Sequence, residues 1–141
     1  TRTGWSSIPE LRFDFASDQP DGVTTFNWKD TDRISLGGEY QPTGSDWSYR
    51  LGVAYDESPI PSDAARTARL PDTDRVWLAL GAGVKLNDSM RVDVGYAHIF
   101  ADDRISAKNA DSNPEDFLRG TLTGTYSGSI DILAAQLEMQ F

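Results

Sequence analysis

Apolar and polar residues alternate in this chain, segment after segment. From Met90 to Ile99 the even positions are apolar or aromatic apart from one His, and the odd positions are Arg, Asp, Gly, Ala and Ile. Successive side chains of a β-strand point to opposite faces, so a period of two predicts an amphipathic strand. The sequence predicts strands at 5–16, 31–41, 46–57, 74–86, 90–104 and 119–141. With no comparable helical segment, we expect an all-β antiparallel fold over residues 1–141.

The composition excludes several classes of protein. Thirteen Lys and Arg stand against 22 Asp and Glu in 141 residues, a net charge of −9, which argues against a nucleic-acid partner. The absence of Cys and the single His exclude thiolate and His-cluster metal sites, and we expect no cofactor. No apolar run approaches the roughly 20 residues of a membrane helix. A membrane protein of this composition would have to cross with strands.

The connections between the predicted strands alternate in length. Long stretches, rich in Asp, Gly, Pro and Ser, alternate with short turns such as Asn87–Ser89. Outer-membrane barrels sort their connections in this way, with long loops outside and short turns in the periplasm. We therefore predict an antiparallel transmembrane β-barrel in the bacterial outer membrane.

The two faces of the predicted strands support this prediction. One face mixes Arg, Lys, Asp and Glu, and the other is apolar with aromatics at the strand ends. Aromatics at both rims of an apolar band match the two interfaces of a bilayer. A soluble sandwich, the alternative, would explain the charged face as a solvated exterior and predicts solubility without detergent.

Six strands cannot close a bacterial barrel on their own. Single-chain barrels have about eight strands or more, and an open edge in lipid leaves unpaired backbone groups. We therefore expect this chain to be part of a larger barrel, with the remainder of the barrel chain as its first partner.

Three segments resemble one known family. Residues 28–37 (WKDTDRISLG) resemble the stretch before a strand in the FadL family of outer-membrane long-chain fatty acid transporters. Residues 49–61 (YRLGVAYDESPIP) resemble the family's next strand and its D-x-S-P-x-P loop. Residues 70–81 (LPDTDRVWLALG) resemble its P-D-x-D-R-x-W-L motif, and the order and spacing of the three also match.

The resemblance implies a fold and a function. The family barrel has 14 strands, so these would be its last six, the C-terminal portion of one barrel domain. The implied function is passive diffusion of long-chain fatty acids or other hydrophobic compounds across the outer membrane, through a porin-like channel that is not an enzyme. Capture at outer loops, movement of an amino-terminal plug and lateral release into the bilayer are implied for the whole protein. Outer-membrane lipid and lipopolysaccharide are the expected surroundings.

The resemblance also suggests residues that face the lumen. Asp30 and Arg75 would lie inside the barrel in a charged cluster with Arg33, extended by Asp74. The candidate ligand or lumen residues are Asp30, Arg33, Arg50, Asp56, Arg75 and Trp77. Such a cluster either satisfies charges within the wall or forms a polar gate, because Arg binds a carboxylate in a bidentate manner.

Three aromatic residues are candidates for apolar contacts. Trp77 shares its face with Ala79 and Gly81, an arrangement that leaves room for an apolar ligand or for a plug. Phe26 and Trp28, in the first long connection, would contact a hydrophobic substrate at the surface or anchor in the headgroup region.

Two other functions remain as alternatives. One is a structural or adhesive barrel whose loops bind a partner. The other is an outer-membrane lipid hydrolase using His98 with Ser106 and Asp102, although no nucleophile elbow is present. The acidic stretch 107–116 is not an EF-hand, because Pro114 and Gly120 occupy the positions that need Gly and Glu.

Overall fold

Five long strands make up the main sheet of this protein. The computed structural model describes residues 1–16, 18, 21–67, 69–109 and 120–140. The long strands are β4 (Thr31–Tyr40), β5 (Trp47–Asp56), β6 (Arg75–Asn87), β7 (Met90–Lys108) and β8 (Leu122–Met139). The shorter elements are β1 (Arg2–Thr3), the 3-10 helix η1 (Trp5–Ser7), β2 (Glu10–Phe13) and β3 (Gly22–Thr25). Within the described residues, no helix has the length and apolar character needed to span a membrane.

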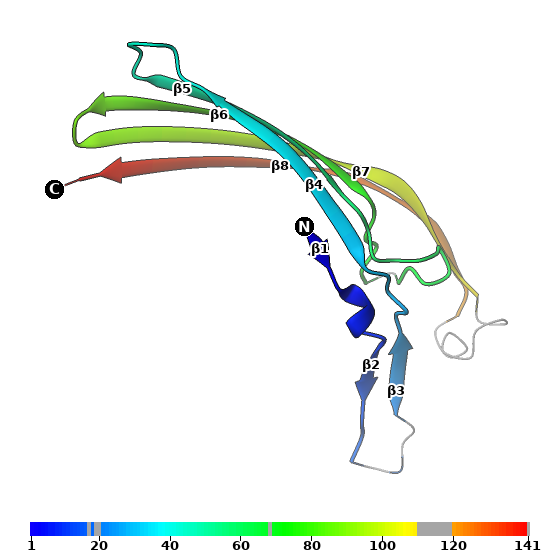
Figure 1. Cartoon of the computed structure of the whole chain (residues 1–141). Helices are drawn as coiled ribbons and strands as arrows, with labels where there is room; N and C mark the ends of the chain where they lie inside the picture. Colours follow the sequence, from blue (N-terminus) through cyan, green and yellow to red (C-terminus); the bar gives the residue numbers. More distant parts are fainter. Residues whose placement is uncertain (17, 19–20, 68, 110–119, 141) are drawn as a thin grey trace. The chain divides into compact units, whose positions relative to one another are not determined.

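The strands follow the chain order across the sheet. The six-stranded sheet has the order β1-β4-β5-β6-β7-β8, and β2 and β3 form a separate pair (Figure 1). Every register that the structure defines is antiparallel, as in β5–β6, where Trp47 opposes Val84 and Asp56 opposes Arg75. The predicted all-β antiparallel fold is confirmed.

The chain divides into two compact units. Unit 1 comprises Thr1–Asp32, Glu57–Asp74 and Asp102–Ser127, and unit 2 comprises Arg33–Asp56, Arg75–Ala101 and Gly128–Phe141. Unit 2 contains both short turns of the large sheet, after β4 and after β6. Unit 1 contains the long connection between β5 and β6.

The sheet of unit 2 exposes its apolar side chains. Ile34 and Leu36 are 71% and 76% exposed, and Leu51 and Leu80 on the neighbouring strands are also exposed. A soluble sheet would bury this face, because burial of apolar area is the main driving force for folding in water. Exposed apolar residues in alternation with partly buried polar and small ones are the pattern of a sheet that faces lipid.

The predicted strand at 5–16 is absent. Trp5–Ser7 is a 3-10 helix instead, and only Glu10–Phe13 is extended, pairing with Gly22–Thr25 in unit 1. Pro9 explains part of the difference because it has no N–H for a sheet ladder. Its carbonyl oxygen accepts hydrogen bonds from the backbone N–H groups of Phe26 and Asn27. The large sheet therefore has five long strands plus the two-residue β1, instead of six long strands.

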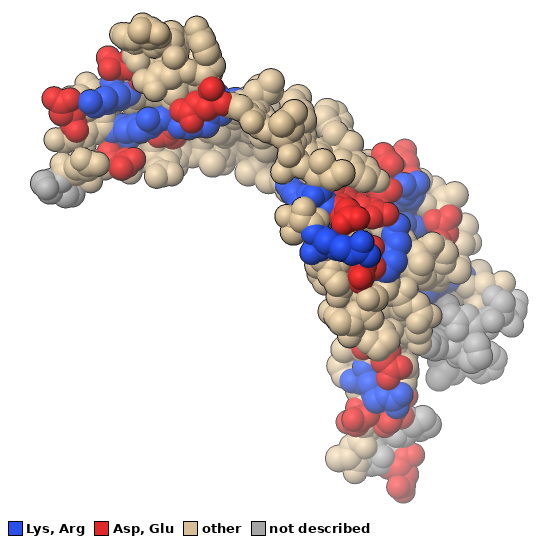
Figure 2. All heavy atoms as spheres, in the orientation of Figure 1, with Lys and Arg blue, Asp and Glu red and all other residues tan. Residues whose placement is uncertain are grey.

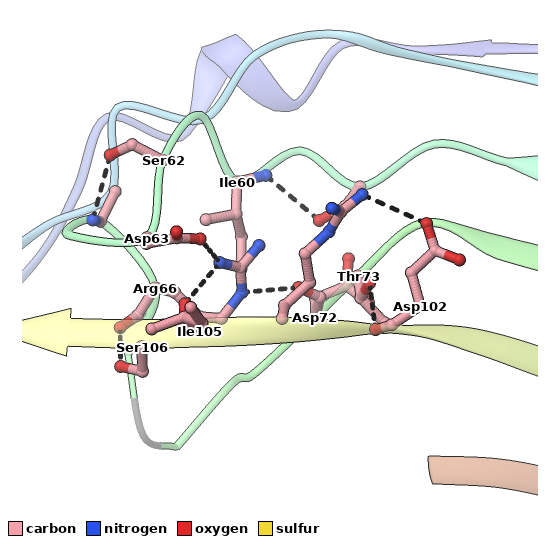
Figure 3. A network of polar contacts seen from close by, with 12 residues as sticks. Ile60, Ser62, Asp63, Arg66, Asp72, Thr73, Asp102, Ile105 and Ser106 are labelled. Atoms are coloured by element: carbon pink, nitrogen blue, oxygen red, sulfur yellow. Dashed lines mark hydrogen bonds and ion pairs between the residues drawn. The ribbon is translucent and has the colours of Figure 1, made fainter. Parts of the chain in front are cut away.

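A buried arginine fixes the long connection of unit 1 to β7. The Arg66 guanidinium is 4% exposed and donates to Asp63 Oδ1 at 2.7 Å and to the Ile105 carbonyl at 3.0 Å. Its Nε donates to the Asp72 carbonyl, and its own carbonyl accepts from the Ser106 hydroxyl (Figure 3). The connection is thus tied to the strand through both the side chain and the backbone of one residue.

Replacing Arg66 should loosen this connection. In Arg66→Met the Asp72 and Ile105 carbonyls lose their charged donor. The free energy needed to open this connection locally should fall by about 2 kcal/mol. Hydrogen exchange in residues 57–74 should then accelerate by about thirtyfold. The control is Arg69→Met, because Arg69 is exposed in the same connection. Equal exchange rates in the two variants would contradict a fastening role for Arg66.

Candidate functional site

The cross-strand register arranges the polar face of unit 2 in rungs. Residues opposite one another in an antiparallel pair project from the same face. We call this the inner face, and its side chains come from alternate residues of β4 to β7. From the end near the long connections, the rungs are Arg33/Asp56/Arg75, Ser35/Ala54/Trp77/Ile99, Gly37/Gly52/Ala79/Ala97, Glu39/Arg50/Gly81/Gly95 and Ser48/Gly83/Asp93.

The first rung is an ion-pair cluster. Asp56 Oδ2 lies 3.2 Å from Arg33 Nη1 and 3.3 Å from Arg75 Nη2. Arg33 also lies over the Trp77 ring, with its guanidinium carbon 4.7 Å from the ring centroid, which is a cation–π contact. One carboxylate in this rung is thus shared by two guanidinium groups.

Small residues dominate the middle of the inner face. Gly37, Gly52, Ala79 and Ala97 form one continuous rung, and Trp77 and Ile99 form the rung beside it. We call the Gly37/Gly52/Ala79/Ala97 rung the small-residue band. An open hollow of about 680 Å³ is lined by residues that include Gly37, Gly52 and Ala79. The buried Trp77 Nε1 has no hydrogen-bond partner among the described residues.

A second charged cluster follows the small-residue band. Arg50 Nη1 donates to Asp93 Oδ1 at 2.6 Å, and Arg50 Nε lies 3.4 Å from Glu39 Oε2. Arg91 Nε donates to Asp93 Oδ2 at 2.8 Å, and its Nη2 donates to the Ser48 hydroxyl at 2.8 Å. Figure 2 shows Lys and Arg side chains interspersed with Asp and Glu in this way. The inner face thus alternates from charged to small and back to charged.

Gly83 leaves the space that this second cluster occupies. A Cβ at this position would collide with Asp93 Oδ1 and would lie 2.7 Å from Arg91 Nη2 and 3.0 Å from Ser48 Oγ. The cluster and the glycine therefore depend on each other. Arg91 and Asp93 were not predicted as site residues, although their alternation places them on the polar face.

The predicted lumen residues are only partly brought together. Arg33, Asp56, Arg75 and Trp77 meet as described, whereas Arg50 belongs to the second cluster. Asp74 lies in unit 1 and accepts from Arg104 at 3.0 Å.

Asp30 has other partners than those expected of it. It lies in unit 1, where it accepts from the Ser6 backbone N–H at 3.0 Å and pairs with Arg2 at 3.8 Å. Side-chain and then backbone hydrogen bonding from Ser6 lowers the pKa of Asp30.

The aromatic residues of the first connection pack against each other in unit 1. Phe26 is buried and stacks on Trp28 with ring centroids 4.4 Å apart, and Trp5 meets Trp28 edge-on at 5.6 Å. This cluster forms part of the small apolar core of the unit. Phe26 is therefore a packing residue in this structure, and Trp28 is half-buried.

The residues considered for hydrolysis are not assembled as a catalytic site. The Ser106 hydroxyl is fully buried and donates to the Arg66 carbonyl. The carboxylate near His98 is that of Asp131 in β8, and Asp102 pairs with Arg104 in unit 1. Most of the acidic stretch 107–116 lies outside the described residues. Among those described, no group of three or more His, Asp or Glu is placed to hold a metal ion.

Substituting Gly83 should destabilise the sheet. Gly83→Ala forces the ends of the Asp93 and Arg91 side chains away from their hydrogen-bond partners, and losing such a bond costs about 1–3 kcal/mol. Gly38→Ala is the matched control, because a Cβ on Gly38 of β4 meets nothing within 4 Å. Urea unfolding of the whole protein in detergent, followed by tryptophan fluorescence, measures both variants. Equal midpoints for the two would contradict the crowding at Gly83.

The chain is similar to known outer-membrane proteins. The family model described as "Outer membrane protein transport protein (OMPP1/FadL/TodX)" matches residues 1–141. A long-chain fatty acid transport protein of Escherichia coli O6:H1 (strain CFT073) is 36% identical over 97 residues, which cover 69% of this chain and 21% of that protein. The 47 kDa outer membrane protein of Pasteurella multocida (strain Pm70) is 38% identical over 101 residues, covering 69% and 22% respectively.

The structure has a similar neighbour among solved structures. The crystal structure of a Pseudomonas aeruginosa FadL homologue matches with a TM-score of 0.81 and 26% identity, covering 98% of this chain and 30% of that one. The chain thus spans about a fifth of the length of these curated relatives and under a third of the structural neighbour.

Proposed function

The chain belongs to the OMPP1/FadL/TodX family of outer membrane transport proteins, and from this membership we propose that the whole protein carries long-chain fatty acids or similar hydrophobic compounds by passive diffusion. The resemblance seen in its sequence motifs is confirmed, as is its place in a β-barrel of the bacterial outer membrane. This chain would contribute part of a 14-stranded wall.

The small-residue band between two charged clusters is the observation that carries this proposal. Glycine and alanine leave space along the wall, and Trp77 and Ile99 give that space an apolar border. An acyl chain fits such a surface through van der Waals contact, while a carboxylate needs donors at one end. The Arg33/Asp56/Arg75 rung places two guanidinium groups next to the band.

The same arrangement favours transport over a purely structural or adhesive barrel. A lumen that is merely filled would carry large side chains, as the interiors of small barrels do. Here the middle rung of four strands has no side chain larger than a methyl group. The remainder of the barrel chain and outer-membrane lipid complete the set of partners that we propose.

Filling the small-residue band should block transport. Ala79→Trp places a large ring in the path, and a barrier of only about 1.4 kcal/mol slows passage about tenfold. Ala82→Trp is the matched control, because Ala82 lies on the opposite face of the same strand, level with Tyr49. Uptake of labelled oleate by cells that lack their own transporter should fall only in Ala79→Trp. Normal uptake by folded Ala79→Trp would favour a structural or adhesive barrel.

Removing a donor of the first rung tests the path of the carboxylate. Arg75→Ala should lower uptake of oleate about tenfold, the expected loss for one charged hydrogen bond. Uptake of an uncharged hydrocarbon of similar length should be unchanged. An equal loss of uptake for both substrates would show that Arg75 supports the structure of the barrel wall. Normal uptake of oleate would show that Arg75 does not contact the carboxylate during transport.

A further inference from the structure

A polar cluster lies on the face of unit 2 that is otherwise apolar. Tyr96 and His98 of β7 both contact Asp131 of β8, and we call these three residues the outer-face cluster. The Tyr96 hydroxyl donates to Asp131 Oδ1 at 2.6 Å, and His98 Nδ1 lies 2.7 Å from the same oxygen. The His98 ring also meets Phe100 edge-on, with ring centroids 4.2 Å apart.

The register places this cluster among exposed apolar side chains. His98 is level with Leu78, and Tyr96 is level with Leu80, which is half exposed. Asp131 has the same alternation as Leu133, whose exposure is 80%, and its own side chain is 60% exposed. A carboxylate is therefore displayed on the surface that faces lipid.

Such a group is costly unless something meets it. Ionisable residues on a lipid-facing surface are rare, and they mark functional positions where they occur. Within the described residues, Asp131 Oδ2 and His98 Nε2 have no hydrogen-bond partner. An ionised carboxylate only accepts hydrogen bonds, and each of its oxygens can accept more than one. Asp131 thus keeps acceptor positions that are not used, and the group that meets them must be an O–H or N–H donor.

The position of the cluster along β7 indicates its depth in the membrane, and therefore which lipid groups can reach it. The apolar alternation of β7 ends at Phe100, since the next residues in the same alternation are Asp102 and Arg104. His98 is two residues further in, which is about 7 Å along the strand. This end of the strand leads into the long connections, which face the outside of the cell in barrels of this class. The acceptors therefore lie where the headgroups of the outer leaflet meet the acyl chains.

We propose that the outer-face cluster is a binding site for lipopolysaccharide, recognised through an amide N–H or hydroxyl donor at the base of its acyl chains. The chemistry is complementary, because the cluster offers acceptors and repels a phosphate, whereas hydroxyls and amides at this depth supply donors. Phe100, Leu78 and Leu133 provide the apolar surface on either side for the acyl chains. This site is on the opposite face from the small-residue band and does not depend on the proposed transport.

Asp131→Leu in the whole protein tests the site. Leucine continues the apolar alternation of β8, so we expect the variant to fold. The control is Ser129→Leu, which adds the same side chain to the same face of β8, two residues from Asp131, and leaves the carboxylate in place. Purified lipopolysaccharide and phosphatidylcholine, which has no N–H or O–H donor, are offered in micelles. The lipid retained is then counted by native mass spectrometry.

We expect the wild-type protein and Ser129→Leu to retain lipopolysaccharide in preference to phosphatidylcholine. Asp131→Leu should bind lipopolysaccharide about tenfold more weakly, with unchanged binding of phosphatidylcholine. Unchanged retention by Asp131→Leu would show that the acceptors are met elsewhere, for example by the rest of the barrel, and would overturn the proposal. A loss of self-association without a change in bound lipid would assign the cluster to an interface between copies, and would overturn it as well.

Discussion

The antiparallel register of β4 to β7 is the constraint on which the other features of unit 2 depend. It fixes which side chains stand level on neighbouring strands, and a shift of one residue would move every side chain of a strand to the opposite face. Because of this register, Asp56 lies between Arg33 and Arg75, and Arg50 reaches Asp93 two strands away. Asp56 thus meets partners from two other strands, and so does Arg50, which contacts Glu39 and Asp93.

The inner face combines two requirements that oppose each other. Charged side chains in a confined space must be paired, because an unpaired charge away from bulk water is strongly unfavourable. The transport that we propose instead needs an open, apolar wall. The chain separates these requirements along the strands, with ion pairs in the outer rungs and Gly37, Gly52 and Ala79 between them. Gly83 has no side chain and so leaves room for the second cluster.

The two faces carry opposite exceptions to their own rule. The inner face is polar but includes Trp77 and Ile99 beside the small-residue band, where an apolar ligand would pass. The outer face is apolar but includes Asp131, which is held by Tyr96 and His98. An apolar side chain on a polar face and a carboxylate on an apolar face are both energetically unfavourable unless they contact a matching group. Both exceptions therefore indicate binding.

The sequence by itself determined the fold class, the membrane location and the two faces of the long strands, because a period of two is a property of neighbouring residues along the chain. It did not determine the fate of residues 5–16, where Pro9 and the pairing of β2 with β3 override the alternation. It grouped Asp30 with Arg75, but only the tertiary structure shows that Asp30 pairs with Arg2 and Ser6. The structure alone also brought Asp131 to His98, 33 residues apart, Arg91 to Ser48 and Asp93 to Arg50. These contacts join residues of different strands, and their geometry depends on a register that no single strand encodes.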